Sequence, residues 1–168
     1  MAESSSEMED IRFKPVGEVH TDATTDQIRS GLGREKAVIE VYEGFEEALD
    51  GLEGFSHLFV VSYFHKLRPE QVGPLKVKPR GLVRQGIRVE ELPTKGVFAL
   101  DSPTRPNPIG LSLVRLVKKE GRNLHVAGLD VFDGTPVLDI KPYQPQYRAE
   151  DYDLPGWYEE LREKAGHV

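Results

Sequence analysis

The sequence predicts a mainly β fold, a compact antiparallel β-barrel or sandwich with one or two peripheral helices. β-branched and aromatic residues form at least six short runs at close spacing, which is typical of antiparallel sheets. Strand and helix patterns do not alternate along the chain, so a parallel sheet of the Rossmann type is not expected. The length of 168 residues suits one packed domain and is short for two.

The predicted strands follow from these runs in chain order. The run 55–65 is too apolar to have a solvent face over its middle, so we expect a strand at the centre of the sheet. Asp133-Gly134 is a strong signal for a hairpin-type turn. We interpret the stretch 20–36 as a polar loop and 46–52 as a short helix. The strand candidates are 13–19, 37–42, 55–65, 96–100, 111–117, 123–126 and 129–132.

The chain divides into three expected segments. Residues 1–10 hold four acids and no base, which predicts a disordered acidic tail. Residues 11–145 contain the β pattern and form the domain. Residues 146–168 form a C-terminal extension in which a helix is expected from Pro155 to Ala165, because proline suits a first helical turn and apolar residues share one face of this segment.

The composition excludes several classes of protein. The chain has no cysteine, which excludes a disulfide scaffold, a thiolate zinc site and a cysteine nucleophile. No apolar run approaches the ~18 to 20 residues that cross a bilayer. The secretory signal pattern is absent as well. We therefore expect a soluble cytoplasmic protein that does not contact membranes.

A basic stretch stands out against the net charge of −6. Between residues 66 and 88 the only acid is Glu70. Such a patch is the electrostatic footprint of a phosphate-bearing partner such as nucleic acid, although a solvated basic loop would give the same pattern. The bases are Lys66, Arg68, Lys76, Lys78, Arg80, Arg84 and Arg88.

Two segments hold polar groups where chemistry could take place. The segment 101–110, DSPTRPNPIG, fixes the backbone with three prolines around Arg105 and Asn107, which lowers the entropy lost when these residues bind a ligand. A structural turn in which Arg105 caps carbonyls is the alternative. The segment 129–143 places three aspartates among apolar residues, where carboxylates are usually paired, hydrogen-bonded or functional. No set of His, Asp and Glu has a convincing metal-ligand spacing, so no metal is expected.

Three segments resemble the signature segments of the TrmO/TsaA-like family, in the same order. They are GLEGFSHLFVVSYFH (51–65), GVFALDSPTRPNPIGLSLV (96–114) and GLDVFDGTPVLDIKPY (128–143), and the resemblance spans about residues 11 to 145. It implies a β-barrel homodimer that binds S-adenosylmethionine near the subunit interface. It also implies methyl transfer to the N6 nitrogen of threonylcarbamoyladenosine beside the anticodon of tRNA.

The resemblance further implies roles for individual residues. The groups able to accept a proton from the acceptor nitrogen are Asp133, Tyr143 and His65. Arg105 and Asn107 would orient cofactor or substrate. The expected cofactor pocket is lined by His65, Lys66, Asp101, Leu111, Leu129, Asp130 and Val131. The basic stretch, not the resemblance, gives the expected tRNA contacts, which are Lys76, Lys78 and Arg80.

Asp101 departs from the family pattern, which has an arginine at this position. A carboxylate cannot make the guanidinium contact to the methionine carboxylate of the cofactor. Either the site is rebuilt around Asp101, or the chain is a non-catalytic module that binds S-adenosylmethionine or tRNA. A methyltransferase with a small-molecule or protein acceptor is the third hypothesis.

Overall fold

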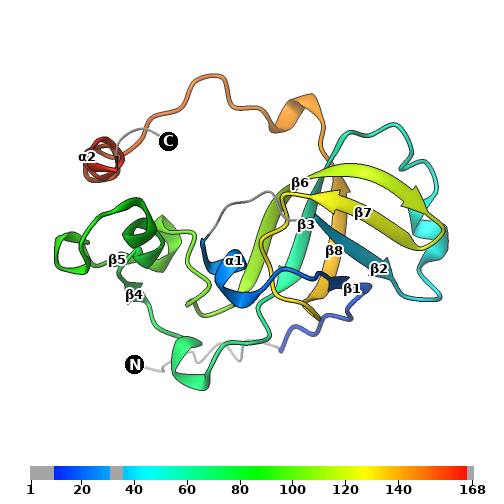
Figure 1. The fold of residues 1–168 in the computed structure, drawn as a ribbon, viewed down its shortest axis with the longest axis horizontal. Helices are drawn as coiled ribbons and strands as arrows, with labels where there is room; N and C mark the ends of the chain where they lie inside the picture. Colours follow the sequence, from blue (N-terminus) through cyan, green and yellow to red (C-terminus); the bar gives the residue numbers. More distant parts are fainter. Residues whose placement is uncertain (1–9, 31–35, 166–168) are drawn as a thin grey trace, which may run out of the picture.

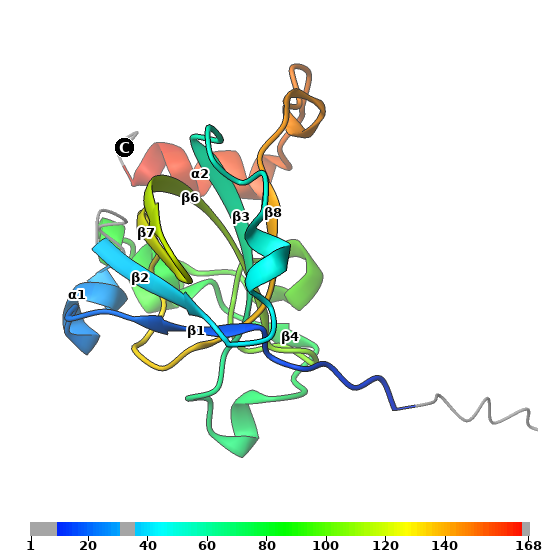
Figure 2. The same cartoon turned by 90° about the vertical axis from the view of Figure 1, so that its right-hand side faces the viewer.

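A closed six-stranded barrel is the centre of the computed structural model, with the strand order β1-β2-β7-β6-β3-β8 (Figures 1 and 2). All neighbouring strands pair antiparallel, which confirms the predicted fold class. The structure describes residues 10–30 and 36–165, so residues 1–9 of the expected acidic tail lie outside it. The barrel strands are β1 (Gly17–His20), β2 (Lys36–Val41), β3 (His57–Tyr63), β6 (Ile109–Glu120), β7 (Asn123–Ala127) and β8 (Pro136–Pro142).

The remaining elements are short. β4 (Lys76–Val77) and β5 (Lys95–Gly96) form a separate two-stranded sheet. The α-helices are α1 (Thr25–Ser30) and α2 (Gly156–Lys164), and neither is long and apolar enough to cross a membrane among the residues described. The 3₁₀ turns are η1 (Glu46–Leu49), η2 (Pro69–Gln71), η3 (Arg80–Gln85), η4 (Val89–Glu91), η5 (Val97–Ala99) and η6 (Pro145–Tyr147).

The barrel interior is filled by alternate residues of each strand. In β3, Leu58 and Val60 are fully buried, whereas Phe59 and Val61 point outward and are half-buried. β3 lies between β6 and β8, but every strand of this closed barrel has two neighbours, so β3 is not central as predicted. The expectation that it lacks a solvent face was wrong, because in a single-layer barrel every strand has an outer side.

The connection between β7 and β8 also differs from the prediction. Residues 129–132 form no strand, and β7 and β8 are not neighbours in the barrel, so the Asp133-Gly134 turn does not join a hairpin. The connection crosses the barrel end with Leu129 and Val131 in the core, which explains their apolar, strand-like pattern.

The helix α1 was missed in the polar stretch 20–36. Its signal is a capping box, in which the Gln27 backbone N–H donates to Thr24 Oγ1 and the Thr24 N–H donates to Gln27 Oε1. The C-terminal helix is confirmed as α2. It packs Leu161 and Trp157 against Ile87 and Leu92, beside the β4–β5 sheet and away from the barrel (Figure 1).

Gly110 is required by packing at the start of β6. A Cβ built there would lie 2.7 Å from Phe64 Cζ and 2.8 Å from Ser62 Oγ. We expect Gly110→Ala to lower the free energy of unfolding by ~1 to 3 kcal/mol, the usual cost of overpacking. Gly81→Ala is the matched control, because nothing lies within 4 Å of its built Cβ. Urea unfolding of both variants measures the difference, and equal stability would contradict this packing.

Candidate functional site at one end of the barrel

Three segments distant in the sequence meet at one end of the barrel. The end of β3 contacts the proline-rich loop, since the Phe64 N–H donates to the Pro108 carbonyl at 2.8 Å. It also contacts the β7–β8 connection, where Lys66 Nζ lies 5.3 Å from the centroid of the Phe132 ring. We call this region, formed by residues 62–66, 108–110 and 129–134, the His65 end of the barrel.

His65 is the titratable group at the centre of this region. Its Nε2 lies 4.0 Å from the position that a Cβ would take on Gly134. Burial, and then the positive charge of Lys66, lower the pKa of His65, while Asp133 opposes this shift. The imidazole is therefore neutral at neutral pH and can accept a proton.

The contribution of Lys66 to this shift can be measured. Removing the ammonium in Lys66→Ala should raise the pKa of His65, since a nearby cation disfavours the imidazolium. In the wild type the folded pKa lies below the ordinary value, so protonation favours the unfolded state. His65 should therefore reduce stability as the pH falls from about 6.5 toward that lower value. Titration of the His65 ring protons by NMR in both proteins tests this, and an unchanged or lower pKa in Lys66→Ala would contradict it.

The aspartates of the β7–β8 connection have different surroundings. Asp133 Oδ1 accepts the backbone N–H of Thr21 at 3.0 Å and so connects the end of β1 to this turn. Asp130 is exposed. Leu129 and Val131 are buried in the core, so only their backbone can face a ligand at this end.

A buried polar atom at the His65 end was not singled out from the sequence. Ser62 is fully buried, and its Oγ has no hydrogen-bond partner among the described residues. An unsatisfied buried hydroxyl is costly and calls for a bound polar group or a water molecule. Together with the cation of Lys66 and the carboxylates of Asp130 and Asp133, it suits a ligand that carries both positive and negative charge.

The proline-rich loop uses its arginine internally. Arg105 donates to the carbonyls of Leu100 and Ser102 at 3.3 Å and of Val97 at 3.4 Å, which is the structural alternative considered above. Asp101 lies between two of these carbonyl-bearing residues and is exposed. Asn107 is also exposed, and its carbonyl accepts the Ile109 N–H at 2.7 Å.

Tyr143 lies at the opposite end of the barrel from His65. Its backbone N–H donates to the His57 carbonyl at the start of β3, whereas His65 follows the end of that strand. Its ring packs 5.7 Å from Phe59 and 6.3 Å from Tyr147, centroid to centroid. A cleft of about 490 Å³ lies beside it, lined by Tyr143, Pro145, Arg148 and Glu150. Within one chain, the three predicted proton acceptors are therefore not brought together.

An apolar surface connects these two ends. Across β3 and β6, Tyr63 pairs with Ile109, Val61 with Leu111, and Phe59 with Leu113, all on the outer side. Leu111 is 69% exposed and Leu113 49% exposed. Leu111 thus lies on the outer wall, away from the turn that carries Asp133. We call this surface the β3–β6 face: Phe59, Val61, Tyr63, Ile109, Leu111 and Leu113.

The basic stretch is partly neutralised. Arg68 pairs with Glu70 and Arg88 with Glu91, each at 3.2 Å. Lys78 donates to the Val89 carbonyl at 3.1 Å. The cations of this stretch that are exposed and make no ion pair with a described residue include Lys76 and Arg80.

The fold is a small antiparallel barrel that carries a candidate ligand site, the His65 end, at one of its ends. The model of the tRNA-methyltransferase O N-terminal domain family matches residues 22–149, and the chain belongs to this family. It is 41% identical over 155 residues to a probable S-adenosyl-L-methionine-binding protein of Methanothermobacter thermautotrophicus, covering 90% of this chain and 99% of that protein.

Longer relatives match over part of their length. A tRNA (adenine(37)-N6)-methyltransferase of Mus musculus is 44% identical over 115 residues, which cover 68% of this chain and 23% of that protein. The crystal structure of TrmO from Pseudomonas aeruginosa superposes with a TM-score of 0.65 at 30% identity, covering 88% of this chain and 62% of that one. The chain thus spans under two thirds of the solved TrmO chain and about a quarter of the mammalian enzyme.

Proposed function

We propose that this protein is an S-adenosylmethionine-dependent methyltransferase. Its proposed acceptor is the N6 nitrogen of threonylcarbamoyladenosine beside the anticodon of cytoplasmic tRNA. The observation that carries the proposal is the family match over residues 22–149, because it includes every segment that meets at the His65 end. The names of the methyltransferase relatives support the reaction, and those of the archaeal relatives support the cofactor.

The residues at the His65 end fit this cofactor. Lys66 can pair with a carboxylate, and Asp130 or Asp133 can face an ammonium or sulfonium group. The buried Ser62 hydroxyl can satisfy a polar atom of the ligand. Arg105 bonds the carbonyls of Leu100 and Ser102 and makes no ion pair with Asp101, so the Asp101 carboxylate stays exposed and available to a site rebuilt around it.

When bound, S-adenosylmethionine supplies an electrophilic methyl group on sulfur. The chain has to hold the acceptor nitrogen in line with that methyl, and positioning alone can provide much of the rate. As the nitrogen gains the methyl group it releases one proton, which neutral His65 can accept. The Phe59, Tyr143 and Tyr147 rings at the other end offer apolar faces on which an acceptor base can stack.

We further propose that the functional form is a homodimer formed through the β3–β6 face. An apolar face of this kind, exposed on two strands of a barrel, marks an interaction site, and a twofold dimer places the same face on both subunits. A twofold axis that lies in this face and runs across the strands would set the Tyr143 end of one chain beside the His65 end of the other. The dimer would then assemble the three predicted proton acceptors from two chains.

The basic stretch supplies the proposed tRNA contacts. We expect tRNA affinity to fall as salt rises, and the charge reversals Lys76→Glu and Arg80→Glu together to lower it at least tenfold with S-adenosylmethionine binding unchanged. Glu70→Gln is the matched control within the same stretch, and it should not weaken binding. Filter binding at several salt concentrations tests this, and a salt-insensitive affinity would favour a small-molecule or protein acceptor.

Mass spectrometry of nucleosides tests the reaction itself. Purified protein is incubated with S-adenosylmethionine and with tRNA that carries threonylcarbamoyladenosine or unmodified adenosine. We expect a mass gain of one methyl on the former nucleoside only. Cofactor binding by calorimetry without transfer would support the non-catalytic binding module instead, and absence of binding at millimolar cofactor would refute both.

A further inference from the structure

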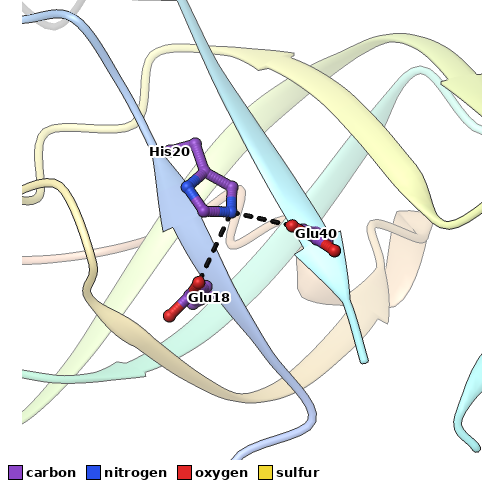
Figure 3. A group of neighbouring side chains, drawn as sticks. All are labelled: Glu18, His20 and Glu40. Carbon is purple, nitrogen blue, oxygen red and sulfur yellow. Dashed lines mark hydrogen bonds and ion pairs between the residues drawn. The ribbon is translucent and has the colours of Figure 1, made fainter. Parts of the chain in front are cut away.

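Three metal-ligating side chains meet on the outer wall of the barrel, outside the site described above. Glu18 and His20 are two residues apart on β1 and so point to the same side, and Glu40 on β2 pairs directly with Glu18 (Figure 3). One potential ligand atom from each residue lies within 4.8 Å of the others. This set has no recognisable spacing in the sequence, because Glu40 is remote from Glu18 and His20 and is brought beside them only by strand pairing.

The distances suit a tetrahedral ion. His20 Nε2 lies 3.0 Å from Glu40 Oε2 and 3.5 Å from Glu18 Oε1. Nitrogen and oxygen ligands bound to Zn²⁺ at 2.0 to 2.2 Å stand about 3.3 to 3.5 Å apart on the edges of a tetrahedron. The third pair, the Glu18 and Glu40 oxygens, lies within 4.8 Å, so the two carboxylates would move toward each other to fill three of the four positions. The partly exposed setting leaves the fourth position to water.

Neighbouring side chains hold the two carboxylates in this orientation. Tyr42 donates its hydroxyl to Glu18 Oε2 at 3.3 Å, and Arg122 lies 3.4 Å from Glu40 Oε1. In each glutamate the oxygen that these groups contact is the one turned away from His20, so the other oxygen faces the imidazole. Such outer contacts orient the ligands of metal sites in proteins.

The local charge also favours a cation. Glu18 and Glu40 are directly opposite across the strands, an arrangement of like charges that is destabilising without compensation. Arg122 pairs with Glu46 at 3.2 Å as well as with Glu40, so its one positive charge is divided between two carboxylates.

We propose that Glu18, His20 and Glu40 bind a divalent transition metal ion of the zinc class, which joins β1 to β2. The imidazole ligand favours Zn²⁺ or Co²⁺ over Mg²⁺ and Ca²⁺, which prefer oxygen ligands alone. The proposal is independent of methyl transfer, because none of these residues belongs to the His65 end.

Titration of the full chain with ZnCl₂ in a calorimeter tests this site. We expect one ion per chain, and an affinity at least tenfold lower in His20→Ala and in Glu40→Gln. The control is His125→Ala. His125 also contacts a glutamate, since its Nε2 lies 2.8 Å from Glu120. The other charged side chain beside Glu120 is Lys118 and not a second carboxylate, so no metal site is expected at His125. The zinc affinity of His125→Ala should equal that of the wild type.

Two further measurements guard against misfolding and adventitious binding. Thermal melting in the presence of a chelator should show that the variants fold, and Zn²⁺ should raise the melting temperature of the wild type and of His125→Ala only. Bound Co²⁺ should give the intense visible absorption of a tetrahedral site in the wild type. The proposal is overturned by equal zinc affinity in folded His20→Ala and wild type, by an equal loss in His125→Ala, or by the absence of saturable binding.

Discussion

Replacement of both Leu111 and Leu113 by aspartate should prevent the proposed dimer from forming and abolish methyl transfer. Both side chains lie at the middle of the β3–β6 face, on the outer side of β6. In the proposed dimer the double variant would bury four unpaired carboxylates, and burying unpaired charge costs several kcal/mol. Since 1.4 kcal/mol corresponds to a factor of ten, we expect the dimer dissociation constant to rise at least ~10³-fold.

Sedimentation equilibrium measures this change, and circular dichroism checks that the monomer keeps its fold. Because both residues point outward, thermal stability of the isolated chain should change little. Phe13→Asp is the control: Phe13 is apolar, 64% exposed and precedes β1, which pairs with β2 and β8 and not with β3 or β6. This variant should keep the dimer and the activity. A monomeric wild type, or a dimeric double variant with full activity, would show that this face is not the interface.

The barrel was predictable because its signals are local. β-branched runs such as 37–42 mark strands whatever their partners, and the 11–145 segment contains the complete barrel. The order of strands around the barrel was not predictable, since it depends on which strands pair with one another to close the sheet. The same limit explains the Asp133-Gly134 turn, which has the composition of a hairpin but joins two strands that do not pair.

The candidate site was predictable in part for a related reason. His65 and Asp133 belong to the family-like segments 51–65 and 128–143, and Lys66 directly follows the first of them. The structure brings the three together because each follows or precedes a strand at the same barrel end. Sequence spacing could not show that Tyr143 lies far from His65, Lys66 and Asp133. β8 runs antiparallel to β3, so Tyr143, which follows β8, lies beside the start of β3 and not beside its end. Ser62 was hidden in an apolar run, where only the structure shows that its hydroxyl lacks a partner.

Arg105 illustrates a different limit. Its surroundings of three prolines suit both a rigid ligand contact and a self-contained turn, and composition does not separate the two. The structure shows three hydrogen bonds to carbonyls of its own loop, so its first role is to hold the backbone around Asp101. The prolines remove N–H donors from this loop, which is why a side chain has to supply part of its internal bonding.

Mixing two inactive variants should restore activity if the site is shared between chains. We expect His65→Ala, which removes the proton acceptor, and Tyr143→Ala, which removes a stacking ring, each to lower methyl transfer by about 10²-fold or more. When the two are unfolded together and refolded, half of the dimers should contain one chain of each kind. In such a dimer one site carries both substitutions, whereas the other combines intact His65 of one chain with intact Tyr143 of its partner.

The mixture should therefore recover about a quarter of wild-type activity, because half of the dimers then hold one working site out of two. Each variant refolded alone is the matched control and should remain inactive. A mixture as inactive as its components would place His65 and Tyr143 in the same chain's site, whereas full activity of the Tyr143 variant refolded alone would remove Tyr143 from the reaction. A further control adds Leu111→Asp and Leu113→Asp to both variants. Chains that do not associate cannot complement each other, so activity should then stay lost in the mixture. Recovery that persists in those non-associating chains would contradict a shared site, whereas its loss would tie methyl transfer to the β3–β6 face.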